Sequence, residues 1–334
     1  MTKTKIDTAI GEYLIPREEE IIKRFVDSFQ KHFEIHHGSK DKVAQRAIHA
    51  KSHGLLKAKL EVFDHGDAAL QYSIFKSPKT YDAIVRISNG DGPAGPDTKK
   101  IVSMGFAIKV LNVTQAKFLP EQTEDAQDFL YINQPAYMTK DVRAYDSLMQ
   151  ARDGGVFKKA KALLRNQRGI RYRFKASPKD NPLNTRYWSA SPFKLGNTAI
   201  KYMIIPVEKQ AVVENAEDDG LKPLVWNQIT QKAANFDFYL QKRLLDGNEK
   251  KAMPIEDYSV EWSEQKSKPV LVGRLHIPQQ EFDETLNARG EHMVFSPWTT
   301  TKDFNPLGSL NRARKVIYHF SASRRRQLNK ERKF

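Results

Sequence analysis

The stretch RAIHAKSHG, residues 46–54, places an arginine and two histidines close together in the chain. His49 and His53 are four residues apart, a spacing that would place two metal ligands on one face of a helix. Gly54 and the polar residues before it instead favour a loop. The stretch therefore indicates either a basic surface turn or one wall of a catalytic pocket.

Composition restricts the chemistry that the chain can perform. The 334 residues are 40% hydrophobic and include no cysteine. We expect a globular protein with a packed core, without zinc–thiolate sites, iron–sulfur clusters or thiol nucleophiles. The N-terminal residues lack the apolar run of a secretory signal, and no window has the length of a membrane span. A cytoplasmic location is therefore expected.

The chain carries an excess of positive charge, with 55 Lys and Arg against 40 Asp and Glu. Such an excess favours an anionic partner, which could be a nucleic acid, a membrane surface or an acidic ligand. Recognition of RNA would need aromatic residues interleaved with basic ones on a strand. The sequence shows no such pattern, so we expect no nucleic-acid partner. Residues 326–334 are interpreted as a solvated basic tail.

Hydrophobic periodicity predicts a mixture of strands and helices without regular strand–helix alternation. Strands are expected at 55–64, 81–90, 101–113, 128–135, 201–207 and 270–278, and helices at 17–35, 139–155, 157–167, 236–247 and 310–328. A short helix is also expected at 40–47. This order is typical of an α+β protein with an antiparallel sheet or β-barrel core and flanking helices. We predict a single domain, 1–334, with an N-terminal helical arm at 1–39.

Four further stretches follow the opening one in a fixed order: VRIS at 85–88, GFAIK at 105–109, DFLYINQP at 128–135 and RKVIY at 314–318. Together the five resemble motifs of the haem-dependent catalase superfamily. Residues 295–318, FSPWTTTKDFNPLGSLNRARKVIY, look most like the small catalase-related peroxidases, which lack the lid and C-terminal domain of large catalases. The resemblance covers residues 40–330 and implies an antiparallel β-barrel that binds haem b (iron protoporphyrin IX).

The resemblance also implies a role for individual residues. Tyr318 would be the axial ligand of the haem iron, as in catalases. Because a tyrosine is ordinarily neutral at pH 7, Arg314, one helical turn earlier on the same face, would stabilise the phenolate. His49 would move a proton between the two oxygens of a hydroperoxide, and Ser88 would fix the orientation of its ring.

The remaining haem contacts follow from the same resemblance. Asn133 would be the amide that donates to bound peroxide. In large catalases this asparagine stands three residues before the proline, whereas Asn133 stands two residues before Pro135 and Ile132 occupies the equivalent position. Tyr145 takes a place where the family often has phenylalanine against the haem plane, and the alternative interpretation is a buried aromatic residue of the core. Three arginines would bind the two propionates of haem, namely Arg46, Arg86 and Arg325.

The activity implied is that of a peroxidase or catalase-like enzyme, which cleaves hydrogen peroxide or organic hydroperoxides through a ferryl-oxo intermediate. The absence of a lid in the small relatives favours larger hydroperoxides and an organic reductant. One alternative is a fatty-acid hydroperoxide lyase or dehydratase, similar to allene oxide synthase. Another is a basic nucleic-acid-binding protein without cofactor. We also expect a homo-oligomer, and the positive charge is compatible with contact to an acidic lipid or membrane surface.

Overall fold

The computed structural model describes residues 6–37, 44–46, 48–90, 103–152, 155–175, 181–208 and 220–331. Its centre is a closed antiparallel barrel in which eight strands pair in the order β7-β5-β4-β3-β2-β1-β9-β8, and β8 pairs again with β7. The strands are β1 (Ser52–Val62), β2 (Lys79–Asn89), β3 (Met104–Leu111), β4 (Ala126–Ile132), β5 (Tyr187–Trp188), β7 (Thr198–Pro206), β8 (Ala234–Lys242) and β9 (Val270–Ile277). Two short strands, β6 (Phe193–Leu195) and β10 (Phe304–Pro306), extend the sheet from β7. The predicted α+β fold with an antiparallel barrel is confirmed.

The interior of the barrel is filled by aromatic and branched side chains. Along β8, Phe236, Phe238 and Leu240 are buried at alternate positions, as expected where every second side chain points inward. Phe129 packs edge-on against Phe238, with 5.2 Å between ring centroids. Burying large side chains of this kind contributes about 1.5–3 kcal/mol each. The barrel is therefore a packed core rather than a pore.

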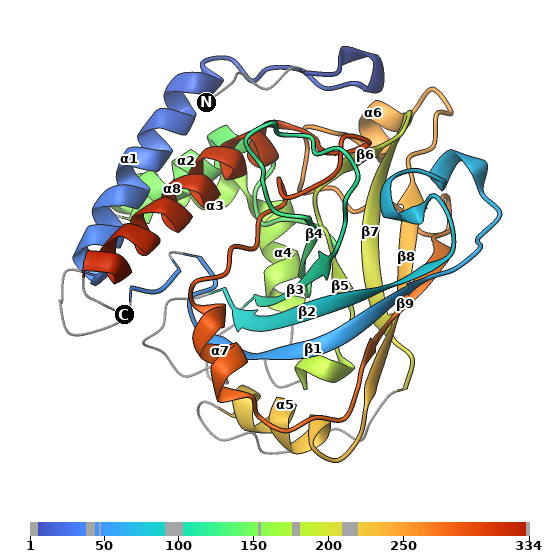
Figure 1. Ribbon diagram of the computed structural model, residues 1–334. Coiled ribbons are helices and arrows are strands. Elements are labelled where there is room, and N and C mark those ends of the chain that lie inside the picture. Colours follow the sequence, from blue (N-terminus) through green and yellow to red (C-terminus); the bar gives the residue numbers. More distant parts are fainter. Residues whose placement is uncertain are drawn as a thin grey trace.

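Helices flank the barrel, and Figure 1 shows α1, α2 and α8 together on one side of it, with α5 and α7 near its other end. The first three share an apolar contact formed by Ile21, Phe25, Val142, Ala313 and Ile317. The helices are α1 (Glu18–His37), α2 (Val142–Arg152), α3 (Val156–Arg165), α4 (Gln167–Lys175), α5 (Leu221–Ile229), α6 (Glu249–Ala252), α7 (Glu284–Gly290) and α8 (Ser309–Glu331), with 3-10 turns at Thr8–Ile10, Ala68–Leu70, Ser73–Phe75 and Pro182–Asn184.

A buried ion-pair network attaches the N-terminal arm to α8. The guanidinium of Arg312 contacts carboxylates of Glu12 at 2.8 Å, Glu18 at 2.6 Å and Glu256 at 3.0 Å. All four side chains are almost fully buried. Removing one partner of such a network leaves an uncompensated buried charge, which commonly costs about 3–5 kcal/mol. The arm predicted at 1–39 is therefore fixed against the last helix over its described residues.

The structure differs from the sequence prediction at 236–247, where a helix was expected. Residues 234–242 form β8, between β7 and β9. Phe236, Phe238 and Leu240 satisfy a two-residue period, while Leu244 and Leu245 extend the pattern to one that a helix also fits. Because the segment pairs with both β7 and β9, it forms a strand rather than a helix.

The structure also differs from the solvated basic tail expected at 326–334, over the described residues as far as Glu331. Helix α8 continues to that residue, and Leu328 and Asn329 are buried. Asn329 accepts a hydrogen bond from the backbone N–H of Ala44 at 2.7 Å, which accounts for its burial. The short helix expected at 40–47 lies largely outside the described residues. That the chain forms a single domain stays a prediction. No helix in the described ranges has the length and hydropathy to cross a bilayer.

Candidate active site

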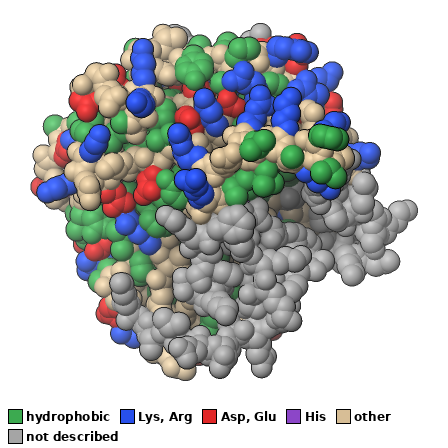
Figure 2. All heavy atoms as spheres, turned by 180° about the vertical axis from the view of Figure 1, so that it is seen from behind, with side chains coloured by type: hydrophobic (Ala, Val, Ile, Leu, Met, Phe, Trp, Pro, Cys, Tyr) green, Lys and Arg blue, Asp and Glu red, His purple; other side chains and the backbone are tan. Residues whose placement is uncertain are grey.

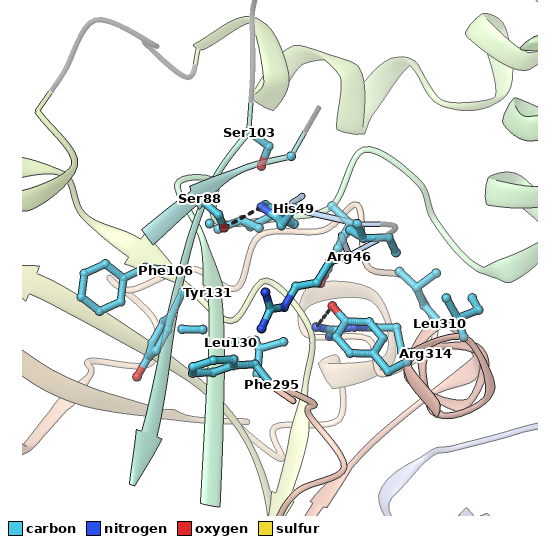
Figure 3. A pocket seen from close by; sticks show the side chains of 18 of the residues that line it. Arg46, His49, Ser88, Ser103, Phe106, Leu130, Tyr131, Phe295, Leu310 and Arg314 are labelled. Carbon is cyan, nitrogen blue, oxygen red and sulfur yellow. Dashed lines mark hydrogen bonds between the residues drawn. The ribbon is translucent and has the colours of Figure 1, made fainter. Parts of the chain in front are cut away.

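A cavity of about 250 Å³ lies between the barrel and α8 and is shown in Figure 3. His49, from the loop before β1, and Tyr318, from α8, both line it. Residues of α8 at helical spacing form one wall, namely Leu310, Ala313, Arg314, Ile317 and Tyr318. A smaller cavity of about 40 Å³ is also lined by Tyr318 and reaches Arg325. The barrel and the last helix thus bring the two ends of the sequence pattern to one site.

His49 is held from two directions at the end of the barrel. The Oγ atom of Ser88, on β2, lies 3.3 Å from Nδ1 of His49, as Figure 3 shows. On the neighbouring strand, β3, a Cβ atom at Gly105 would lie 2.4 Å from the same nitrogen and 2.9 Å from Ser88 Oγ. Only glycine leaves room there for the histidine–serine pair. His49 also has a φ of +53°, which is uncommon for a residue other than glycine.

The surroundings of His49 keep its imidazole neutral. Burial, together with the nearby cations of Arg86 and Arg314, lowers the pKa of His49 to about 3. The side chain is therefore uncharged near neutral pH, where one ring nitrogen can accept a proton. A neutral imidazole next to a cavity has the properties of a general base.

Tyr318 is paired with Arg314 on the opposite wall of the cavity. Nη2 of Arg314 donates to the Tyr318 hydroxyl oxygen at 3.4 Å, and its guanidinium lies 5.4 Å from the Tyr318 ring centroid. Nη1 of Arg314 donates to Asn311 Oδ1 at 2.9 Å. Although burial opposes the charge, the phenol groups of Tyr137 and Tyr318 raise the pKa of Arg314. A permanent cation thus lies beside the phenol oxygen.

Three buried arginines gather at the rim of the two cavities. Arg86 donates to the backbone oxygen of His49 at 2.8 Å, and Arg46 donates to that of Met293 at 2.7 Å. Arg325 donates to the same Met293 oxygen at 3.0 Å. Figure 3 shows Arg46 projecting into the space between His49 and Arg314. The three cations that the sequence predicted as a group therefore lie close together.

The charge of this cluster is only partly balanced. Among the described residues, the carboxylate that faces the three arginines is Glu291, 3.4 Å from Nη1 of Arg46. Burial and the cation of Arg46 lower the pKa of Arg325 to about 9, and they hold the pKa of Arg86 well below its ordinary value. The Nε atoms of Arg86 and Arg325 are buried without a hydrogen-bond partner in the described structure. A ligand with two negative charges would satisfy this cluster.

Asn133 is not among the described residues that line the cavity. Its amide oxygen accepts a hydrogen bond from the backbone N–H of Met104 at 2.9 Å, which extends the pairing of β3 and β4. Its neighbours Ile132 and Gln134 do line the cavity. Gln134 is buried, and its Nε2 has no partner among the described residues. Of these two residues it is thus Gln134, not Asn133, that borders the cavity.

Tyr145, on α2, lines the cavity, and its ring contacts Phe25 of α1 with 4.8 Å between ring centroids. Sequence reasoning missed Phe25, Gly105 and Gln134. Gly105 and Gln134 lie in the GFAIK and DFLYINQP stretches, which could have marked them, whereas Phe25 lies in none of the five stretches. His53 is buried outside the cavity, with Nε2 2.7 Å from Asn89 Oδ1, and is a core residue.

The residues present fit a haem better than a bare metal ion. Within the described ranges no group of three His, Asp or Glu side chains is arranged to hold a metal. Tyr318 would supply a phenolate oxygen to the iron, the kind of ligand that holds haem in catalases. The unpartnered Nε atoms of Arg86 and Arg325 are donors for carboxylates, and haem b carries two propionates. The donor set and the charge imbalance both match this cofactor.

Comparison with solved structures shows proteins with a similar fold. No family model matches the sequence, and no curated protein sequence matches it. The fold is similar to that of a fungal catalase, with a TM-score of 0.69, 16% identity, and coverage of 97% of this chain and 66% of the catalase. For a bacterial catalase the TM-score is 0.67 and the identity 17%, with coverage of 97% of this chain and 63% of that catalase. For catalase A from Saccharomyces cerevisiae the TM-score is 0.66 and the identity 17%, with coverage of 98% of this chain and 68% of that catalase. The chain thus has a catalase-like fold and spans about two thirds of the length of these catalases.

Proposed function

We propose that this chain, with its catalase-like fold, is a haem b-dependent peroxidase that cleaves hydroperoxides. One observation carries the proposal. A single cavity is lined on one wall by a neutral histidine held by Ser88, and on another by a tyrosine that accepts a hydrogen bond from Arg314. This pairing of an acid–base group with an iron-ligating group is the arrangement that peroxide cleavage needs.

Four side chains would hold the cofactor. Tyr318 would bind the iron as a phenolate, and the cation of Arg314 beside it stabilises that charge. Arg46, Arg86 and Arg325 would bind the two propionates, which would complete the charge balance of their cluster. When bound, haem supplies the electrons that break the oxygen–oxygen bond.

His49 would move one proton within the substrate. With Nδ1–H donating to Ser88 Oγ, Nε2 keeps its lone pair and takes the proton from one peroxide oxygen. His49 then returns this proton to the other oxygen, which leaves as water or an alcohol. Its lowered pKa ensures that the base is available near pH 7.

Gln134 is the group that we assign to the orientation of the peroxide. Its buried Nε2 has no partner among the described residues, and Gln134 is one of the residues that line the cavity. An amide N–H that donates to the peroxide would hold the substrate near His49. A preorganised donor of this kind can contribute about 10²-fold or more to a rate.

The lining of the cavity favours organic hydroperoxides beside hydrogen peroxide. Phe25, Ile48 and Ile317 give it apolar walls, and apolar substituents gain from burial against such walls. This observation supports a second candidate function, the rearrangement of fatty-acid hydroperoxides by a lyase or dehydratase. Product analysis separates the two, because reduction gives a fatty-acid alcohol, whereas the lyase gives aldehyde fragments and the dehydratase an allene oxide.

The test is the reaction of the haem-loaded protein with hydrogen peroxide, followed by stopped-flow absorbance. His49→Ala should keep haem and slow the reaction by about 10²–10⁴-fold, while exposed His292→Ala should react like the unaltered protein. Unchanged kinetics in His49→Ala would remove the histidine from the mechanism. A colourless protein that takes up no haem and binds nucleic acid with a steep salt dependence would instead support the alternative without cofactor.

A further inference from the structure

Helix α3 exposes an apolar stripe that the rest of the described chain does not cover. Phe157 is 93% exposed, Val156 80%, Leu164 68% and Leu163 60%. Spacings of one, seven and eight residues place these side chains on one face of the helix. Ala162, on another face, is buried where α3 packs beside α2. An apolar stripe of this kind on a surface helix marks a site of interaction.

Positive charge surrounds this stripe. Residues 156–175, which form α3 and α4, include eight Lys and Arg and no Asp or Glu. Lys158, Lys159 and Lys161 are exposed and form no ion pair with a described residue. Figure 2 shows the molecule from behind, so the side of Figure 1 that holds α2 and α3 lies at its upper right. Lys and Arg side chains gather there around hydrophobic ones. The surface combines exposed hydrophobic side chains with a net charge that needs an anionic partner.

We propose that α3, with the start of α4, is a docking surface for an anionic lipid bilayer. A helix with an apolar face and lysines along its borders lies in the plane of a membrane interface, with its apolar side chains among the acyl chains. Each lysine near an anionic surface contributes to the attraction. This inference does not depend on the function proposed above.

Two other occupants fit the surface less well. A nucleic acid would pair with the lysines but would leave Phe157 and Leu164 in water, because phosphate contacts dominate its binding. A second copy of the chain in a twofold contact would bring the same cations of both copies together, which is unfavourable. A bilayer of mixed charge satisfies both the apolar stripe and the lysines.

The first experiment measures co-sedimentation of the full chain with lipid vesicles. We expect binding to phosphatidylcholine vesicles that contain about 30% phosphatidylserine, and little binding to phosphatidylcholine alone. Addition of salt to about 0.5 M should weaken the binding, because it screens the lysines. No binding to the anionic vesicles at low salt would overturn the proposal.

The second experiment tests whether α3 is the surface used. Replacement of Lys158, Lys159 and Lys161 with Gln should weaken binding by about a hundredfold, from about 1 kcal/mol for each cation. The matched control replaces exposed Lys76, Lys250 and Lys251 with Gln, which changes the net charge equally. Equal weakening in both triple variants would overturn the assignment to α3, because it would indicate attraction by overall charge.

The apolar stripe has its own variant, Phe157→Ser with Leu164→Ser, and its control is Leu245→Ser with Leu14→Ser, two other exposed leucines. We expect vesicle binding to be about tenfold weaker in the stripe variant and unchanged in the control variant. If the stripe variant binds vesicles as tightly as the unaltered chain does, the bilayer is the wrong partner. The same conclusion follows if RNA binds as tightly as vesicles and its affinity is the same for the stripe variant and the unaltered chain. If the chain is an oligomer by sedimentation and the stripe variant makes it monomeric, the stripe is instead an interface between copies. Thermal unfolding should be alike in all variants, because every altered side chain is exposed.

Discussion

Replacement of Gly105 with alanine should separate peroxide chemistry from haem binding. The new Cβ would lie 2.4 Å from His49 Nδ1 and 2.6 Å from Cε1, about 1 Å closer than ordinary heavy-atom contact. Because the β3 backbone is fixed by pairing with β2 and β4, the imidazole has to move. A displacement of about 1 Å in a catalytic group can cost about 10²-fold in rate.

The assay is stopped-flow absorbance after the variant is loaded with haem and mixed with hydrogen peroxide. We expect a rate constant about 10²-fold lower and an unchanged haem content, because Tyr318 and Arg314 lie on the opposite wall. Overpacking should also lower the free energy of unfolding by about 1–3 kcal/mol. Gly155→Ala is the control, since no atom lies within 4 Å of its added Cβ. A folded Gly105→Ala protein with the original rate constant would refute the role given to His49.

Three further predictions concern other groups of the site. Arg325→Met should leave the haem-free protein at least as stable, because like charges crowd its cluster. It should also weaken haem affinity by about tenfold or more, through loss of a charged hydrogen bond, and haem titration and thermal unfolding measure both effects. Gln134→Leu should slow the peroxide reaction by about 10²-fold without loss of haem, whereas Asn133→Leu should mainly lower the unfolding free energy; the opposite result would return the amide role to Asn133. Because the pKa of His49 is about 3, its base stays neutral and the peroxide rate should be flat from pH 8 to about 5. Its pKa is about 6.5 in the unfolded chain, so acidification below that pH should lower the free energy of unfolding. Denaturant titrations at pH 5 and pH 8 should show a smaller loss in His49→Gln than in the unaltered protein. A peroxide rate that falls with a midpoint near pH 6.5 would contradict the assignment of His49 as neutral.

Much of the barrel could be predicted because its strands carry a clear local signal. Residues 55–64 and 81–90 alternate, and they form β1 and β2 within a few residues of the expected bounds. The segment at 236–247 shows the limit, since its apolar residues fit two periods and only β7 and β9 decide between them. Strands as short as β5 and β6 have no period that a sequence could show.

The site divides in a similar way. His49 with Ser88, and Arg314 with Tyr318, were predicted as pairs, and the structure places each pair within hydrogen-bond distance. The amide could not be assigned in this way, because β4 ends at Ile132 and its alternation stops there. Which of the next two side chains enters the cavity depends on a contact with Met104 on another strand.

The most direct test of the proposed function is a titration of the cofactor-free protein with haem, followed by its visible spectrum, for the unaltered chain and for Tyr318→Phe. We expect one haem for each chain, with a high-spin ferric spectrum typical of tyrosinate ligation, and a clearly shifted spectrum or loss of haem in Tyr318→Phe. Failure of the unaltered chain to bind haem, or the same spectrum in both proteins, would contradict the assignment of Tyr318 as the iron ligand.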